Sequence, residues 1–411
     1  MQLRRRILKR CRSLEVVTFR DIITEESRGY PREIKRRCRL GKMRSAMQRA
    51  RYSVLPPPPL TLRQLTDILQ DPHYTVLTNT DDGQDNIYAA SVTDTQGSHH
   101  IIFMSQRMAR VMKRLSILFG DGTFLTLPVL EDLDAASQIF AIVGNWDHTI
   151  VPLAWVLMQR QTVPAYRAVF RALKALVGDF PHLSKFISDF EAAIRVSVTA
   201  EFPGITMQGC FFHLVRAMIK YVKNTLRLHR LLQRHPYKRF VKLCCALPLL
   251  PLRYIRRGFE LIVQEARQFG PGIYRRIRPF FAYVMRQWVG HPIRRRWICV
   301  FGSEHRTNNT CESHNRMLKN FVKVAHPSVY QFISALISVE SNADADASAL
   351  SQGERPNRRR RFSSVMLDRR LRNLMRQIRN PPDNVDNAIM RYLDNALHTF
   401  DNAYDRAVEE V

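Results

Sequence analysis

Short runs of apolar residues, bounded by polar or glycine residues, recur through the first half of the chain and predict β-strands. Strands are expected at 74–77, 87–92, 100–104, 115–120, 123–130 and 138–143, and an apolar stretch follows at 149–158. Between 163 and 177 the apolar residues return at helical spacing, and short strands that end at Asp189 and Cys210 are each followed by another helix. This order predicts an α/β fold with one central mixed sheet and flanking helices.

The strand pattern fades from about residue 214 to 300, where Leu, Arg and aromatic residues follow helical spacing. We expect an all-helical insertion there, after which "RTNNTCESHNRMLKNFVK" (306–323) returns to the α/β core with a helix that opens at a Thr/Asn cap. Residues 342–364 are rich in Asp, Ser and Ala and contain four consecutive arginines, which predicts a disordered linker. The tail, 365–411, is expected to be helical and peripheral.

The N-terminal segment has the composition of a basic arm, either helical on binding or disordered alone. Four consecutive prolines at 56–59 predict a stiff linker behind it. The expected organisation is a basic arm at 1–55, a lead-in region at 56–105, the first part of the core at 106–213, the insertion at 214–300, the last part of the core at 301–341, the linker at 342–364 and the tail at 365–411.

The formal charge of +28 is unevenly distributed along the chain. It sums to +12 over residues 1–60, −4 over 61–213, +18 over 214–300 and +2 over 301–411. Twenty basic residues against two acidic ones in the insertion indicate a polyanionic partner, and nucleic acid fits best. An anionic membrane fits less well, because the basic residues are interleaved with core-type residues and do not form one amphipathic face. No apolar run is long enough to predict a membrane span.

Three acidic residues stand where predicted elements end or begin. Asp121 follows the strand 115–120 between two glycines, which is also typical of a turn. Asp189 ends a later strand, and Glu312 opens the helix after the insertion. Because functional groups of an open α/β sheet gather at strand ends, the three are candidates for one site.

Carboxylates in such a cluster suit a hard divalent cation, Mg²⁺ or Mn²⁺. Without a cation they would repel one another and raise each other's pKa values. Two ions about 4 Å apart can activate a hydroxyl and stabilise the leaving oxygen in a displacement at phosphorus. The chemistry that these residues favour is therefore metal-dependent phosphoryl transfer.

Four segments in order, "DGTF", "SDFEAAI", "GCFFH" and "TNNTCESHN", resemble the Mutator-like (MULE) transposase domain, a DDE transposase with a ribonuclease H-like fold. The resemblance covers about residues 100–340 and includes the helical block that precedes the glutamate. It favours a catalytic role for Asp121 over the interpretation of Asp121 as a turn residue. It implies that Asp121, Asp189 and Glu312 are the catalytic, metal-binding acids. The implied function is DNA cleavage and transfer between transposon ends and target in the nucleus, compatible with a homo-oligomer. The alternative is a co-opted or decayed copy that binds DNA without catalysis, for example as a regulator.

Cys210 and His213 match the family's CxxH signature. A zinc site needs four ligands, and no second Cys/His pair stands at zinc spacing. The alternatives are a small buried Cys with a hydrogen-bonded His, or a His213 that touches the scissile phosphate. Asn308 and Asn309 are expected to act as caps and loop anchors, His314 as a partner that supports the acids, and Glu191 as an acid at a helix N-terminus.

Trp288 has two interpretations: core packing, or stacking on a base displaced from DNA, as in related hAT-type transposases. The arginines expected to contact phosphates are Arg256, Arg257, Arg294, Arg295 and Arg296. Family members often carry an N-terminal zinc module that reads DNA ends, but only Cys11 and Cys38 stand in this region. The arm is therefore expected to contact phosphates rather than to read sequence.

Overall fold

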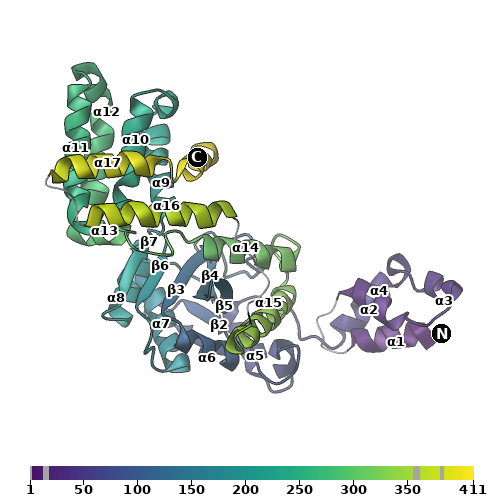
Figure 1. The fold of residues 1–411 in the computed structure, drawn as a ribbon. Coiled ribbons are helices and arrows are strands. Elements are labelled where there is room, and N and C mark those ends of the chain that lie inside the picture. The colour runs from purple at the N-terminus through teal and green to yellow at the C-terminus, as the bar shows by residue number, and fades with distance from the viewer. Residues whose placement is uncertain (1, 13–17, 355–361, 380–383) are drawn as a thin grey trace. The chain divides into compact units, whose positions relative to one another are not determined.

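The computed structural model describes residues 2–12, 18–354, 362–379 and 384–411. Seven strands form one mixed sheet in the order β1-β2-β5-β4-β3-β6-β7 (Figure 1). The pairs β1–β2, β2–β5 and β4–β5 are antiparallel, whereas β3–β6 and β6–β7 are parallel. The strands are β1 (Tyr88–Thr93), β2 (His99–Phe103), β3 (Ile117–Thr123), β4 (Gln138–Trp146), β5 (Thr149–Met158), β6 (Lys185–Ser188) and β7 (Thr206–Gly209). The predicted mixed α/β fold is confirmed at this level.

Two of the predicted strands are wrong. The stretch 74–77 lies largely in the 3-10 helix η1 (Thr75–Thr78). Beyond Thr123, the stretch 123–130 forms turns and loop: the Leu127 amide donates to the Phe124 carbonyl, and the Val129 amide donates to the Pro327 carbonyl. Pro128 has no amide hydrogen to give to a ladder, so the apolar side chains of this stretch do not make a strand.

By contacts the chain divides into two compact units. The first unit comprises Met1–Leu115, Asp121–His182 and Cys311–Pro356, and the second comprises Ser116–Gly120, Leu183–Thr310 and Asn357–Val411. The helices of the first unit are α1 (Gln2–Cys11), α2 (Phe19–Glu26), α3 (Arg32–Arg37), α4 (Leu40–Tyr52), α5 (Leu62–Gln70), α6 (Gln106–Arg114), α7 (Val163–Val177) and α15 (Val329–Ser351), together with most of α14 (Asn309–Val322).

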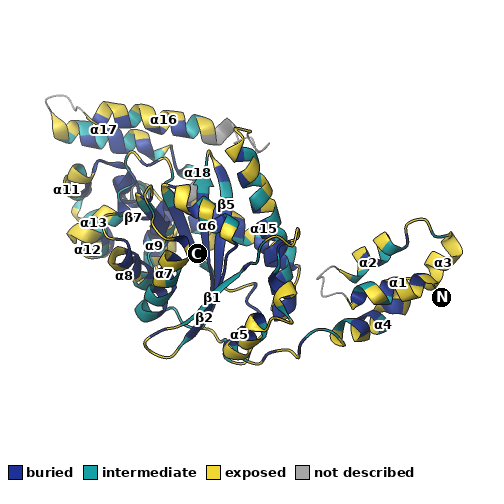
Figure 2. Ribbon diagram, turned by 90° about the horizontal axis from the view of Figure 1, so that it is seen from below, coloured by how far each residue is buried: buried dark blue, intermediate teal, exposed yellow. Residues whose placement is uncertain are grey.

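In the first unit, helices cover both faces of the strands. Side chains alternate along a strand, so Phe103 of β2 faces α15, where it packs edge-on against Phe332 with ring centroids 6.2 Å apart. On the opposite face Phe140 of β4 packs against Tyr166 and Phe170 of α7, at 5.2 and 6.0 Å. The strands appear largely in the colour of buried residues in Figure 2.

The prediction of a disordered linker at 342–364 is wrong for residues 342–351, which belong to helix α15. The helix continues to Ser351, and Ala343, Ala347 and Leu350 are buried at helical spacing. These small residues resemble a linker by composition, but they let the helix pack closely. The arginine run at 358–361 lies outside the described residues.

The N-terminal arm contains four helices, α1 to α4. The helices α1, α2 and α4 lie side by side (Figure 1), and their apolar side chains share a small cluster that includes Leu3 and Ile7 of α1 and Met43 and Met47 of α4. Arg6 also pairs with Glu26, with 2.9 Å between Nε and Oε2. The residues of the arm that the structure describes are therefore largely helical.

The second unit is mostly helical outside β3, β6 and β7. Its helices are α8 (Ala192–Glu201), α9 (Phe211–Lys220), η2 (Tyr221–Thr225), η3 (His229–Gln233), α10 (Tyr237–Ala246), η4 (Leu247–Leu249), α11 (Leu252–Gln268), α12 (Pro271–Val284), η5 (Met285–Val289), α13 (Pro292–Ile298), α16 (Phe362–Arg379), α17 (Val385–Leu397) and α18 (Asp401–Glu410). Helices therefore dominate 214–300, as the periodicity predicts. None of the described helices is long and apolar enough to cross a membrane.

The C-terminal tail is helical but not peripheral. Ile389 and Leu393 of α17 are fully buried in the same apolar cluster as α9 to α12, and α17 lies against α11 (Figure 1). The Tyr392 hydroxyl donates to the Leu249 carbonyl at 2.6 Å. The tail therefore completes the core of the helical block.

Candidate functional site

Two of the candidate acids directly follow the paired residues of two parallel strands, β3 and β6. The β3–β6 ladder pairs Phe119 with Ile187 and ends at the pair Gly120–Ser188. Asp121 is the next residue along β3, and Asp189 is the next residue after β6. Phe119 and Ile187 are fully buried, so the apolar runs that precede the acids form the interior part of each strand.

Asp121 lies within β3, and this excludes the turn interpretation. The side-chain amide of Asn315, on α14, donates to Asp121 Oδ2 at 3.1 Å. At the next position, a Cβ on Gly122 would stand 1.9 Å from Gln138 Oε1. A larger residue at 122 would therefore require the end of the Gln138 side chain to move.

Glu312 lies in the first turn of α14, three residues before Asn315. Residues three apart in a helix are neighbours on one face. Asn315 touches Asp121, so Glu312 projects from the same face of α14 as the residue that holds Asp121. Asp121 and Glu312 both belong to the first unit.

Asp189 is positioned by its own turn and by a buried arginine. Its Oδ1 accepts the Glu191 amide at 3.0 Å, and its main-chain carbonyl accepts Arg195 Nε at 3.0 Å and Nη2 at 2.8 Å. Arg195, on α8, is fully buried. Its guanidinium lies 4.5 Å from the ring centre of Phe190 and 4.6 Å from that of Trp297.

Burial lowers the pKa of Arg195 to about 10, so the side chain stays charged at neutral pH. Gly209 makes room for this arrangement, because a Cβ there would stand 2.3 Å from Phe190 and 2.9 Å from Arg195 Nη2. The positively charged Arg195 side chain thus binds the main-chain carbonyl of Asp189 within the second unit.

Cys210 immediately precedes α9, His213 lies within α9, and Asn308 immediately precedes α14. Cys210 is buried, and its sulfur accepts the Asn308 amide at 3.1 Å. The Asn308 side chain donates to the Gly120 carbonyl at 3.4 Å. Asn308 is therefore a loop anchor, as predicted, and Cys210 fits the structural interpretation. His213 Nδ1 is buried and has no hydrogen-bond partner among the described residues.

Asn309 opens α14 and is exposed, and Glu191 immediately precedes α8, as expected for an acid at a helix N-terminus. His314 is 1% exposed, and its Nε2 accepts the Trp155 indole N–H at 2.8 Å. Burial lowers the pKa of His314 to about 4, so the imidazole is neutral. His314 therefore attaches α14, which carries Glu312, to β5.

Trp288 is 5% exposed and packs edge-on against Phe190, with ring centroids 4.8 Å apart. Its environment is that of core packing. Of the candidate arginines, four have partners in the fold: Arg256 binds Glu260, Arg257 binds Asp386, Arg294 binds Gln287, and Arg295 donates to the Val289 carbonyl. Arg296 is exposed and has no partner among the described residues.

The candidate acids are divided between the two units: Asp121 and Glu312 belong to the first and Asp189 to the second. Within the described ranges, no three or more His, Cys, Asp or Glu side chains are grouped closely enough to hold a metal ion. The oxygen donors themselves are of the type that Mg²⁺ and Mn²⁺ prefer.

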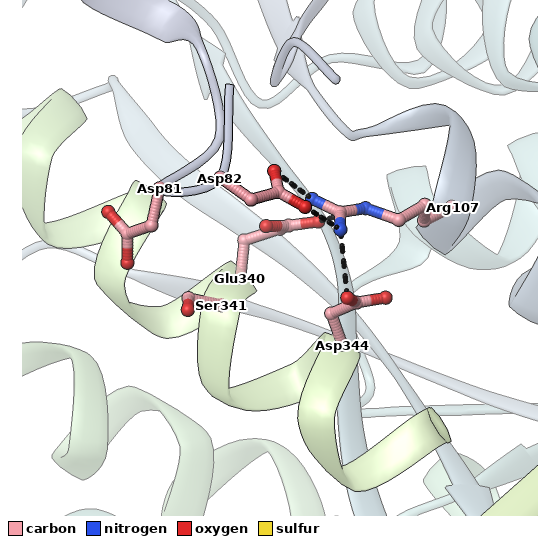
Figure 3. A pocket seen from close by; sticks show the side chains of 6 residues that line it. All are labelled: Asp81, Asp82, Arg107, Glu340, Ser341 and Asp344. Atoms are coloured by element: carbon pink, nitrogen blue, oxygen red, sulfur yellow. Dashed lines mark hydrogen bonds and ion pairs between the residues drawn. The ribbon is translucent and has the colours of Figure 1, made fainter. Parts of the chain in front are cut away.

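A separate acidic pocket of about 300 Å³ lies in the first unit and contains none of the predicted site residues (Figure 3). Arg107 Nη1 donates to Asp82 at 2.8 Å and to Asp344 at 2.9 Å. Glu340 is fully buried beside it and accepts the Ser105 hydroxyl at 2.6 Å, and burial raises the Glu340 pKa. The network links α6 to α15.

Residues 117–217 match the family model of the MULE transposase domain. The chain carries a MULE transposase domain. The matched segment begins at β3 and ends within α9, so it includes Asp121, Asp189, Cys210 and His213, whereas Glu312 lies outside it. No curated protein matches the chain.

Arg195 and Asn315 are contacts that the sequence analysis missed. Arg195 is the single basic residue of α8 and stands between Ile194 and Val196, and a charge among apolar positions of a helix signals a buried, paired group. Asn315 stands one helical turn after Glu312, on the predicted site face. Both spacings are visible in the sequence.

Proposed function

We propose that this protein is a Mutator-like DDE transposase that cleaves and joins DNA strands with the help of Mg²⁺ or Mn²⁺. The observation that carries the proposal is the position of Asp121 and Asp189 inside the MULE domain, each directly after the paired residues Gly120 and Ser188. The contact between Asn315 and Asp121 supports the inclusion of Glu312, which lies one turn away on the same helix face. The implied place of action is the nucleus.

In this proposal Asp121, Asp189 and Glu312 would hold the metal ions. Bound there, Mg²⁺ or Mn²⁺ would supply activation of a water or hydroxyl and stabilisation of charge on the leaving oxygen. Asn315 orients the Asp121 carboxylate, and Arg195 fixes the backbone at Asp189. His314 keeps α14 against β5 without adding charge to the site.

The test is a nicking assay on duplex DNA with Mg²⁺ or Mn²⁺. The variants Asp121→Asn, Asp189→Asn and Glu312→Gln should each lose cleavage while they keep the thermal unfolding midpoint of the wild type. Glu191→Gln is the matched control, because this acid stands two residues from Asp189 and is assigned to the helix N-terminus. Full cleavage by Asp189→Asn would refute the assignment of the acids.

The alternative is a domain that binds DNA and no longer cuts it. A wild-type protein that binds duplex DNA but shows no cleavage with either metal would support this alternative. Binding by the three acid variants at or above the wild-type affinity is expected in both cases, because each variant removes negative charge near the DNA.

A further inference from the structure

The helix α12 and the π-helix η5 that continues it present two different faces. Ile277, Phe280 and Val284 are buried in the core of the second unit. The opposite face carries Arg275, Arg278 and Arg286, which are all exposed. This follows from helical periodicity, since residues 275, 278, 282 and 286 recur at intervals of three or four.

These arginines are not used by the described part of the fold. None of the three has a hydrogen-bond or ion-pair partner among the described residues, and Arg276 beside them is also exposed. No Asp or Glu stands in the sequence between Glu265 and Glu304. Charges of one sign in a row repel one another, so an arrangement without local counter-charges favours an external polyanion.

The geometry of the row suits a phosphate backbone. From Arg275 to Arg286 the helix rises by about 16 Å, roughly the axial length of five nucleotides of one strand. Between the arginines stand Pro279 and Ala282, which are exposed and small. They leave room for a backbone to approach, and they offer no large apolar side chain that would insert into a membrane.

We propose that Arg275, Arg278 and Arg286 form a contact surface for the sugar-phosphate backbone of duplex DNA. The proposal rests on the proposed function only for its biological role, because the binding can be measured without cleavage. Guanidinium groups donate hydrogen bonds in a fork that matches phosphate oxygens. The row is distinct from the candidates Arg256, Arg257, Arg294 and Arg295, which have partners in the fold.

The test compares two triple variants of the full chain by fluorescence anisotropy with a labelled duplex over a salt series. The first replaces Arg275, Arg278 and Arg286 with Gln. The matched control replaces Arg369, Arg370 and Arg376 of α16 with Gln, and so removes the same charge from exposed positions of the same unit. The α12 variant should lose at least about tenfold in affinity, with a salt slope lower by about 2 to 3, whereas the control should stay within about twofold.

Each outcome decides between the proposals. Wild-type affinity in the α12 variant would overturn this surface while leaving the transposase assignment intact. An equal loss of affinity in both variants would show that only the net charge of the protein matters, and this result would also refute the proposed α12 surface. Preferential binding of the wild type to phosphatidylserine vesicles over duplex DNA would assign the surface to a membrane instead. A wild type that binds no DNA would refute the proposed function as well. Matched circular dichroism spectra exclude unfolding as the cause of a loss.

Discussion

Arg107 of α6 and Arg278 of α12 carry the same guanidinium group in opposite surroundings. Arg107 lies among Asp82, Glu340 and Asp344, and its bonds join two helices of the first unit (Figure 3). Arg278 stands on an open helix face with no partner among the described residues. The fold uses the first charge for its own stability and leaves the second available to a ligand.

The comparison yields a rule for this chain. An ionisable group in the interior is either matched by an opposite charge or dipole, as with Glu340 and Arg195, or held neutral, as with His314. A basic group outside either pairs with a surface acid, as Arg257 does with Asp386, or faces solvent. Changes to interior groups should therefore alter stability, and changes to open surface groups should alter binding.

The largest effect is expected from His314 as the pH falls. The unfolded imidazole takes up a proton below its ordinary pKa of about 6.5, whereas the buried one resists protonation until about pH 4. The unfolded state thus binds more protons, so stability is complete above pH 6.5 and falls towards pH 4, by about 3 kcal/mol from this group.

Urea unfolding at several pH values measures this loss. His314→Gln is the comparison variant, because its amide can still accept the Trp155 N–H and does not titrate. It should show a shallower loss of stability between pH 6.5 and pH 4. A pH dependence identical to that of the wild type would refute the assignment to His314.

The next effect concerns Arg107. Arg107→Met removes the cation beside the buried Glu340, and the loss of one member of such a network should cost about 2 to 3 kcal/mol in the free energy of unfolding. Arg110→Met is the matched control, because Arg110 is exposed on the same helix. DNA affinity should be the same in both variants. Equal unfolding free energies in the two proteins would show that the network adds no stability.

Much of the fold could be predicted from local patterns. The strands β3, β4 and β5 follow apolar runs bounded by polar or glycine residues, and this signal depends only on neighbouring positions. The stretch 123–130 has similar side chains, but its amides bond in turns and loops and Pro128 has none to give. At 342–351 a linker was wrongly predicted from composition, because the small buried residues of a long helix are also typical of linkers.

The candidate site shows the same limit. Asp121 and Asp189 were found because each follows an apolar run in the sequence, and the strand register places both after one residue pair. The contacts of Arg195 with the Asp189 carbonyl and of Asn315 with Asp121 join residues whose meeting depends on how helices pack on strands. No local pattern contains that information, although each residue stands at a suggestive spacing.

Arg195 is a buried cation that binds the main chain of the candidate acid Asp189. Arg195→Met removes two charged hydrogen bonds to the Asp189 carbonyl and should cost about 1 to 2 kcal/mol in unfolding free energy. It should also lower the rate of DNA nicking. Arg195→Lys keeps the charge without the two-donor fork and should lie between Met and wild type in rate. A folded Arg195→Met protein that nicks at the wild-type rate would show that Arg195 does not position Asp189.

The smallest expected effect is the difference in DNA affinity between substitutions of Arg257 on α11 and Arg278 on α12. Arg257 on α11 is already bound to Asp386 and Glu260, so contact with a phosphate would require it to leave these partners. Arg278 on α12 has no such partner among the described residues and can donate all its bonds to a ligand. Single substitutions to Gln at the two positions should both leave the thermal unfolding midpoint close to that of the wild type, because exposed ion pairs contribute little. In the anisotropy assay Arg278→Gln should lower DNA affinity by about two- to fivefold, and Arg257→Gln by less. Equal losses of affinity would mean that DNA phosphates displace Asp386 and Glu260 from Arg257. An ion pair within the chain would then not decide whether an arginine binds DNA.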